Sequence, residues 1–134
     1  MNKKNFKKYI ELSKALVTRN SRHVSFIVNK GKILSIGLNN PQKTHPKILK
    51  YNYINREKED IRHDVGIHSE LSSVIKLGTE NLNKHQMINV RIDLNGEVAM
   101  SKPCNGCQDM INQLGINEVY YTDKNGICRG IIRW

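Results

Sequence analysis

The stretch Ser101-Lys102-Pro103-Cys104-Asn105-Gly106-Cys107 is the strongest fold signal in this chain, because it places two thiols at the predicted start of a helix. Pro103 suits a helix entry, since the N–H that proline lacks would be unpaired there anyway. Cys104 and Cys107 lie three positions apart, so in a first helical turn both sulfurs project on one side and can reach one ion. Alone, this spacing is shared by redox sites, structural zinc sites and catalytic zinc sites.

A second motif, His68-Ser69-Glu70, lies at the predicted start of an earlier helix. Apolar residues recur after it at helical spacing as far as Gly78, where the helix is expected to stop. His68 and Glu70 would point to different sides of a regular helix, so they can converge only above its N-terminal end. The dipoles and unpaired N–H groups of two helix N-termini would favour thiolates and other anions at that place. Alone, a histidine beside an acidic residue at a helix start is more often a capping or surface feature.

The two motifs together change the interpretation. H-x-E opening one helix and P-C-x-x-C opening a second, separated by a helix and a strand, form the signature of zinc-dependent nucleobase deaminases. We expect His68, Cys104 and Cys107 to bind Zn²⁺, with a fourth position left for water and Glu70 as the group that moves protons. The alternative is a structural site with His63 or Cys128 as fourth ligand, in which Glu70 would have no purpose. Otherwise Cys128 is predicted to be a small buried residue of a C-terminal strand.

On these motifs the chain resembles the cytidine and deoxycytidylate deaminase superfamily over nearly its whole length, as a single domain of residues 1–134. The resemblance implies an α/β fold with three αβα layers and a five-stranded mixed sheet, with the zinc between two helix N-termini. Gly37-Leu38-Asn39 resembles the family's G-x-N, which implies that Asn39 contacts the substrate nucleoside. Ser101, Lys102 and Pro103 resemble the substrate-facing loop of the deoxycytidylate branch, and Ser69 is also expected to contact substrate.

Apolar periodicity predicts the element order αββαβαββ, ending in a β-hairpin. An amphipathic helix comes first, because apolar residues from Phe6 to Val17 recur at helical spacing among lysines. Two strands flank a polar turn that contains Gly31, at a position suited to positive φ. The predicted strands are 24–28, 33–38, 88–94, 116–122 and 127–134, and the later helices run from about 68 to 78 and from 104 to 114.

A long connection from Asn39 to Ile67 interrupts these elements, with proline breakers and a charged stretch. Long connections in compact domains are often functional. We therefore expect Lys43 and His45 to line the pocket and meet a phosphate or sugar, with a solvated loop as the alternative.

The substrate is less constrained than the metal site. A short turn between the last two strands suits the free-cytidine deaminases, whereas a His-Cys-Cys metal set resembles the deoxycytidylate, tRNA and polynucleotide branches. We expect deamination of the cytosine of a free nucleoside or nucleotide (cytidine, deoxycytidine or dCMP) to uracil, with release of ammonia. A polynucleotide cytidine deaminase or a nucleic-acid-binding relative is the alternative, and other aminated bases share the same chemistry.

Charge and cysteine content bound the remaining possibilities. The net charge of +10 is concentrated in residues 1–50, which hold twelve Lys and Arg against Glu11 alone, that is 12 − 1 = +11. Such a region can attract nucleic acid or anionic nucleotides, or can be a solvated helix face. Three cysteines argue against a disulfide framework, and no apolar run spans a membrane, so a cytoplasmic protein is expected. The family resemblance also allows a homo-oligomer.

Overall fold

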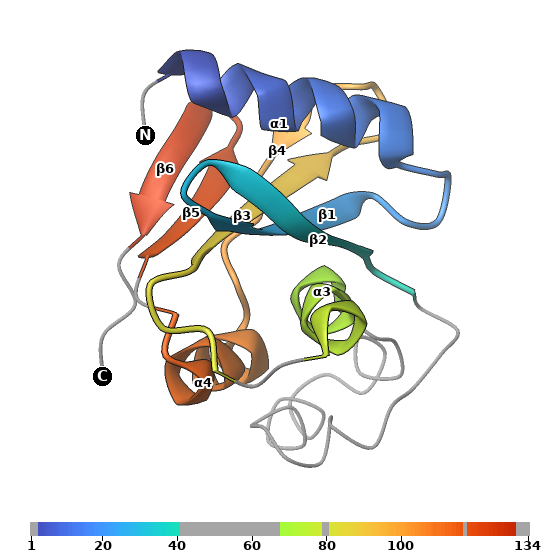
Figure 1. The fold of residues 1–134 in the computed structure, drawn as a ribbon. Helices are drawn as coiled ribbons and strands as arrows, with labels where there is room; N and C mark the ends of the chain where they lie inside the picture. The colour runs from blue at the N-terminus through green and yellow to red at the C-terminus, as the bar shows by residue number, and fades with distance from the viewer. Residues whose placement is uncertain (1–2, 41–67, 79–80, 117, 131–134) are drawn as a thin grey trace.

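The computed structural model of the chain describes residues 3–40, 68–78, 81–116 and 118–130 (Figure 1). Within them the order of helices and strands follows the prediction, with one short strand added. The elements are α1 (Lys3–Leu16), β1 (His23–Asn29), β2 (Lys32–Leu38), α3 (Ser69–Leu77), β3 (Gln86–Ile92), β4 (Val98–Ala99), α4 (Asn105–Leu114), β5 (Glu118–Asp123) and β6 (Gly126–Gly130).

The strands form one mixed sheet in the order β2-β1-β3-β5-β6. Strands β3 and β5 are parallel, and the other neighbouring pairs are antiparallel. The predicted five-stranded mixed sheet is thus confirmed, and β4 adds a short sixth strand that pairs with the end of β3. Two residues are too few to produce a periodic sequence pattern, which is why β4 was not predicted.

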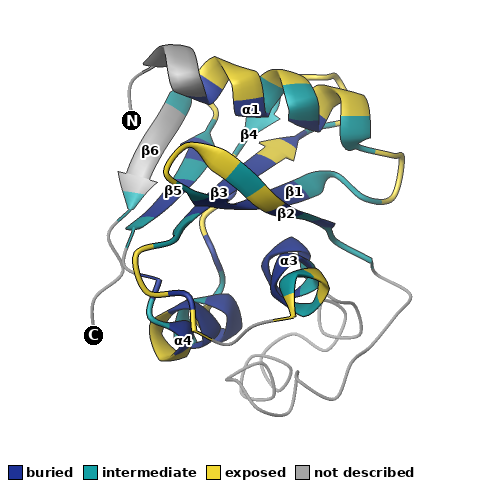
Figure 2. Cartoon of the chain, in the orientation of Figure 1, coloured by how far each residue is buried: buried dark blue, intermediate teal, exposed yellow. Residues whose placement is uncertain are grey.

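Three layers result, as predicted, with α1 on one face of the sheet and α3 and α4 on the other (Figure 1). Successive side chains of a strand point to opposite faces of the sheet, so each central strand contributes apolar residues to a core on either face. Phe26 and Ile88 belong to the core beneath α1, which also contains Phe6 and Tyr9. The second core joins the sheet to α3 and α4, with members from β1, β3, β5 and both helices. Figure 2 shows exposed residues along the outer side of α1 and buried residues where α3 and α4 meet the sheet.

Both hairpins have two-residue turns. Between β1 and β2 the turn residues Lys30 and Gly31 have φ of 52° and 77°, the pair of positive angles that a type I′ turn requires. Between β5 and β6, Asp123 pairs with Gly126, so the turn is two residues shorter than the sequence predicted. The predicted antiparallel C-terminal hairpin is confirmed.

Helix ends agree closely with the sequence. Gly78 and Gly115 end α3 and α4 in the left-handed conformation, with φ of 76° and 84°. Strand β3 begins and ends two residues earlier than predicted. No helix in the described ranges is long and apolar enough to span a membrane. Residues 41–67, which include Lys43, His45 and His63, lie outside the described part of the chain.

Candidate active site

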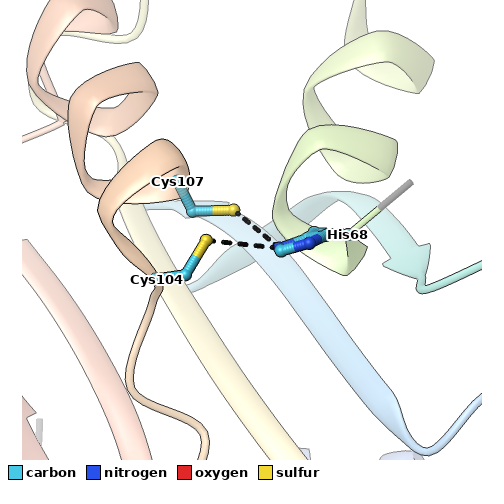
Figure 3. A group of neighbouring side chains, drawn as sticks. All are labelled: His68, Cys104 and Cys107. Carbon is cyan, nitrogen blue, oxygen red and sulfur yellow. Dashed lines mark hydrogen bonds between the residues drawn. The ribbon is translucent and has the colours of Figure 1, made fainter. Parts of the chain in front are cut away.

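The site lies where the N-terminal ends of α3 and α4 face each other across the end of the sheet (Figure 3). His68 is the N-cap of α3 and Cys104 is the N-cap of α4, and both have extended backbone angles. Neither uses its side chain to cap its helix. The imidazole and the thiol instead point toward each other, and Cys107 points to the same place from the first turn of α4.

The three predicted ligands are brought together. His68 Nδ1 lies 3.4 Å from Cys104 Sγ and 3.6 Å from Cys107 Sγ. All three candidate ligand atoms lie within 4.8 Å of one another. Tetrahedral zinc with its usual bonds to nitrogen and sulfur needs an N···S separation of about 3.6 Å. The donor set and its spacing therefore fit Zn²⁺.

The electrostatics of the sulfurs also fit a cation. The pKa of Cys104 is lowered to about 3, chiefly by the hydrogen bond from the Cys107 thiol; burial acts in the opposite direction, and the hydrogen bond and charge of His68 add to the lowering. Cys104 is therefore a thiolate at neutral pH, the form that binds metal. Cys104 and Cys107 both have free thiols.

Glu70, the predicted proton carrier, is the second residue of α3 and is almost fully buried. As a carboxylate it accepts hydrogen bonds from Ser69 Oγ to Oε1 and from Asn89 Nδ2 to Oε2, each of 3.1 Å. Burial raises the pKa of Glu70, while the charge of His68 acts in the opposite direction. A carboxyl group in such surroundings is suited to hold a proton and to give it up.

Beneath Glu70 lies a buried polar ring that sequence reasoning missed, made of Ser25, Ser69, Glu70 and Asn89. Ser25 Oγ lies 2.7 Å from Ser69 Oγ and donates to Asn89 Oδ1 at 2.7 Å. The exposed fractions are 0% for Ser25, 2% for Ser69, 2% for Asn89 and 7% for Glu70. We call this set the Glu70 ring. The only signal was a serine in β1 and an asparagine in β3. Both strands hold other polar residues as well, and polar strand positions usually mean a solvated face.

Ser101 and Pro103, two of the residues predicted to contact substrate, have structural partners. Ser101 Oγ donates to Asn89 O at 2.9 Å and accepts from Thr122 N at 2.7 Å, tying the loop before α4 to β3 and β5. Pro103 is buried, and its carbonyl accepts from Gln108 Nε2 at 2.8 Å. Lys102 between them is exposed. Contact of these three residues with a substrate stays a prediction.

Asn39 follows directly after β2 and is held beside β1. Its Oδ1 accepts from His23 N at 3.0 Å, and its carbonyl accepts from Ser21 Oγ at 2.6 Å. Among the described residues, the Asn39 Nδ2 group has no hydrogen-bond partner. The predicted nucleoside contact of Asn39 is compatible with that amide group and stays a prediction, as does the contact assigned to Ser69, whose hydroxyl lies in the Glu70 ring.

Gly37 explains how α3 comes so close to the sheet. A Cβ at this position would lie 2.3 Å from Ser73 N and 2.4 Å from Ser69 O, both in the backbone of α3. Only glycine leaves room for the helix backbone here. Because α3 carries His68 and Glu70, Gly37 sets the depth at which these side chains lie.

A shallow cleft lined by arginines opens at the end of β3, with a volume of about 420 Å³. Arg91 is two positions beyond Asn89 on the same face of β3, about 7 Å along the strand, and its side chain is exposed. Arg22 is held by the carbonyl oxygens of Ile92 and Thr18. The cleft is lined by Arg19, Arg22, Arg91, Asp93, Leu94 and Asn95.

His23 is influenced by charges both from this cleft and from the candidate metal ligands. It pairs with Arg91 in the β1–β3 register. Burial, together with the charges of Arg91 and His68, lowers the pKa of His23 to about 4. His23 is therefore neutral at pH 7. The charge of Arg91 in the cleft and the charge of His68 among the proposed ligands both disfavour its protonation.

A three-layer fold with a His-Cys-Cys group and a buried glutamate between two helix N-termini defines the deaminase class of zinc proteins. Residues 2–123 match the family model described as the cytidine and deoxycytidylate deaminase zinc-binding region, and the chain belongs to this family. No curated protein matches the sequence significantly.

Solved structures with the same fold come from a phage and a bacterium. The dCMP deaminase of cyanophage S-TIM5 in apo form is 21% identical, with a TM-score of 0.55 over 90% of this chain and 82% of that chain. The same phage enzyme in complex with dCMP and dUMP is 18% identical, with a TM-score of 0.56 over 92% and 84%. The cytidine deaminase of Mycobacterium leprae is 17% identical, with a TM-score of 0.55 over 93% and 92%. At these identities the likeness establishes the fold.

Proposed function

We propose that this protein is a zinc-dependent hydrolase that converts the cytosine of a free nucleoside or nucleotide to uracil and releases ammonia. The observation that carries the proposal is the buried Glu70 carboxyl beside three ligand atoms with zinc-like spacing. A purely structural zinc site gives no reason to bury a carboxylate two residues from a ligand, because burial of a charged group is unfavourable.

The chain's own residues supply the binding and the proton transfers. His68, Cys104 and Cys107 would hold Zn²⁺, which when bound acts as a Lewis acid and makes water more acidic. Glu70 takes one proton from the attacking water and delivers it to N3 of the cytosine ring. Glu70 then passes the second water proton to the departing amino group, so that cytosine and water yield uracil and ammonia. The carboxylate ends in the state in which it began.

Among free substrates, the arginine cleft favours a nucleotide. Arg19 and Arg91 line the cleft, and Arg91 lies on the same face of β3 as Asn89, which contacts Glu70. A guanidinium binds phosphate through charge and paired hydrogen bonds. One of the solved relatives, the cyanophage dCMP deaminase, was crystallised with dCMP and dUMP. We infer that Arg91 binds the phosphate of a cytosine mononucleotide such as dCMP.

Direct assay of five substrates tests the proposal. The zinc-loaded protein is incubated with cytidine, deoxycytidine, CMP, dCMP and a cytosine-containing single strand, and deaminated product is measured by mass. We expect conversion of a mononucleotide, and expect Glu70→Gln to lower kcat by at least about 100-fold while zinc content is unchanged. If no cytosine compound is converted, or if Glu70→Gln turns over as fast as the parent, the proposed mechanism is wrong.

The single-strand arm also tests the alternative of a polynucleotide substrate. Nothing in the comparisons supports nucleic-acid binding, although residues 1–50 carry a net charge of +11 against +10 for the whole chain. Conversion confined to the oligonucleotide, with binding that falls steeply with salt, would replace our proposal by that alternative. A cytoplasmic location and a homo-oligomeric assembly stay predictions, which fractionation and light scattering would test.

A further inference from the structure

We propose that Asn89 is a positioning residue that fixes the orientation of the Glu70 carboxylate, and that Ser25 in turn fixes Asn89. The proposal rests on the proposed function, in which Glu70 moves the protons. Asn89 would not touch the substrate and would act only through Glu70.

The Asn89 amide has only one orientation that satisfies its neighbours. Its Oδ1 accepts from Ser25 Oγ at 2.7 Å, and its Nδ2 donates to Glu70 Oε2 at 3.1 Å and to Ser101 O at 3.4 Å. Turning the amide over would place Oδ1 against a carboxylate and a carbonyl, which are both acceptors. The Ser101 carbonyl and the Glu70 carboxylate, which only accept, therefore select the orientation that presents an N–H to Glu70, and the Ser25 hydroxyl holds the amide there by donating to Oδ1.

Glu70 is in this way held from two sides. Ser69, from the first turn of α3, contacts Oε1, and Asn89, from β3, contacts Oε2. The 2.7 Å contact between the Ser25 and Ser69 hydroxyls joins these two supports and closes the Glu70 ring. Rotation of the carboxylate would break at least one of these contacts in a place that water does not reach, so a single orientation is favoured.

Strand pairing explains why the support is rigid. Ser25 and Asn89 are direct partners in the antiparallel register of β1 and β3. The neighbouring pair on the same face is Ile27 and Met87, and both of these side chains are fully buried in the core beneath α3 and α4. The Ser25–Asn89 pair adds little to the free energy of unfolding, because its hydrogen bonds replace those that the same groups make to water in the unfolded chain. The polar pair occurs at the position beneath Glu70, which points to a role in placing that carboxylate.

The consequence for catalysis follows from the geometry of proton transfer. A group that moves protons must lie within hydrogen-bond reach of both the donor and the acceptor atom. A carboxylate that is free to rotate spends only part of its time in the productive orientation, so turnover falls while substrate affinity changes little. We therefore expect Asn89 variants to alter kcat and to leave KM nearly unchanged.

The test compares Asn89→Ala, Asn89→Asp and Ser25→Ala with the parent protein and with a matched control, Ser35→Ala. Ser35 is also a buried serine, and its hydroxyl donates to Ser73 O at 2.7 Å, away from the Glu70 ring. We expect kcat to fall about 10- to 100-fold in both Asn89 variants and several-fold in Ser25→Ala, with KM within about twofold and zinc content unchanged. Asn89→Asp keeps the shape of the side chain but replaces the N–H donor by an acceptor, so it separates orientation from packing. Ser35→Ala should lose stability and keep its kcat.

A second readout does not depend on turnover. Crystal structures of the zinc-loaded parent and of Asn89→Ala would report the Glu70 side chain directly, and we expect one orientation in the parent and more than one in the variant. A single unchanged Glu70 orientation in Asn89→Ala, or a kcat loss no greater than that of Ser35→Ala, would overturn the proposal. If the parent deaminates no cytosine compound, the proposed function is wrong. The crystal structures still test the positioning role of Asn89 in that case, because they report the orientation of the Glu70 side chain without any turnover. Should Asn89→Ala fail to fold, Ser25→Ala carries both readouts.

Discussion

Replacing Gly37 by alanine should displace the helix that carries His68 and Glu70. The added Cβ would lie 2.3 Å from Ser73 N and 2.4 Å from Ser69 O, whereas real Cβ contacts almost never fall below 3.0 Å. Both atoms belong to the α3 backbone, so the helix must move as a body. Relief of both contacts to ordinary van der Waals distance requires a shift of about 1 Å.

Such a shift has two separable effects. Overpacking of this kind lowers the free energy of unfolding by about 1 to 3 kcal/mol. Metal sites tolerate distance errors of only about 0.2 Å, so moving His68 by about 1 Å relative to the two cysteines should weaken zinc binding at least tenfold. The same movement of Glu70 should lower kcat by about 100-fold.

Competition with a chromophoric chelator measures zinc affinity, urea titration measures stability, and product formation gives kcat. Gly31→Ala is the matched control, because Gly31 has a φ of 77° and nothing lies within 4 Å of its Cβ position. That variant should lose about 1 kcal/mol to backbone strain and keep its zinc affinity. If Gly37→Ala binds zinc and turns over like the parent, our account of how α3 is placed is refuted.

Three further predictions concern single residues. Cys107→Ala should lower zinc affinity by at least tenfold and raise the pKa of Cys104 from about 3, because the hydrogen-bond donor that stabilises the Cys104 thiolate is lost. Thiol alkylation of the metal-free protein as a function of pH measures this pKa. Arg91→Ala should raise KM for dCMP about tenfold and leave KM for deoxycytidine unchanged, and equal effects on both would contradict a phosphate contact. For His23, the folded pKa of about 4 lies below the usual 6.5, so the unfolded chain binds the proton first as pH falls. Its contribution, at most about 3 kcal/mol, is present above pH 6.5 and is lost between pH 6.5 and 4; urea unfolding of the parent and His23→Gln should converge in that window.

The grouping of the three candidate metal ligands could be predicted from sequence because local signals mark their positions. The bounds of α3 and α4 could be predicted from the motifs at their starts and the glycines at their ends. The candidate ligands lie at those helix starts, so their grouping could be predicted without the order of the strands. The shift of β3 by two residues reflects tertiary context, since Gln86 and Met87 join the strand by pairing with β1 and β5.

The Glu70 ring and the arginine cleft could not be predicted in the same way. Ser25 meets Asn89 only through the β1–β3 register, and those strands are far apart in sequence. Arg19 and Arg91 likewise share a cleft only after these strands pair. Sequence periodicity shows on which face of a strand a side chain lies, but it does not show which strand lies beside that strand. Sites formed by residues from two neighbouring strands therefore cannot be predicted from it.

The Glu70 ring has a further consequence that appears when its hydrogens are counted. Ser25 and Ser69 bring two hydroxyl hydrogens to three oxygen–oxygen contacts, namely Ser25–Asn89, Ser25–Ser69 and Ser69–Glu70. With Glu70 ionised, one of these contacts lacks a hydrogen. A proton on Oε1 of Glu70 completes the set: hydrogens then run from Glu70 to Ser69, to Ser25 and to Asn89, whose amide returns to Oε2 of Glu70. The Glu70 ring thus has a hydrogen-bond partner for every hydrogen of the protonated carboxyl, the form that Glu70 would take in the proposed reaction between receiving a proton and delivering it.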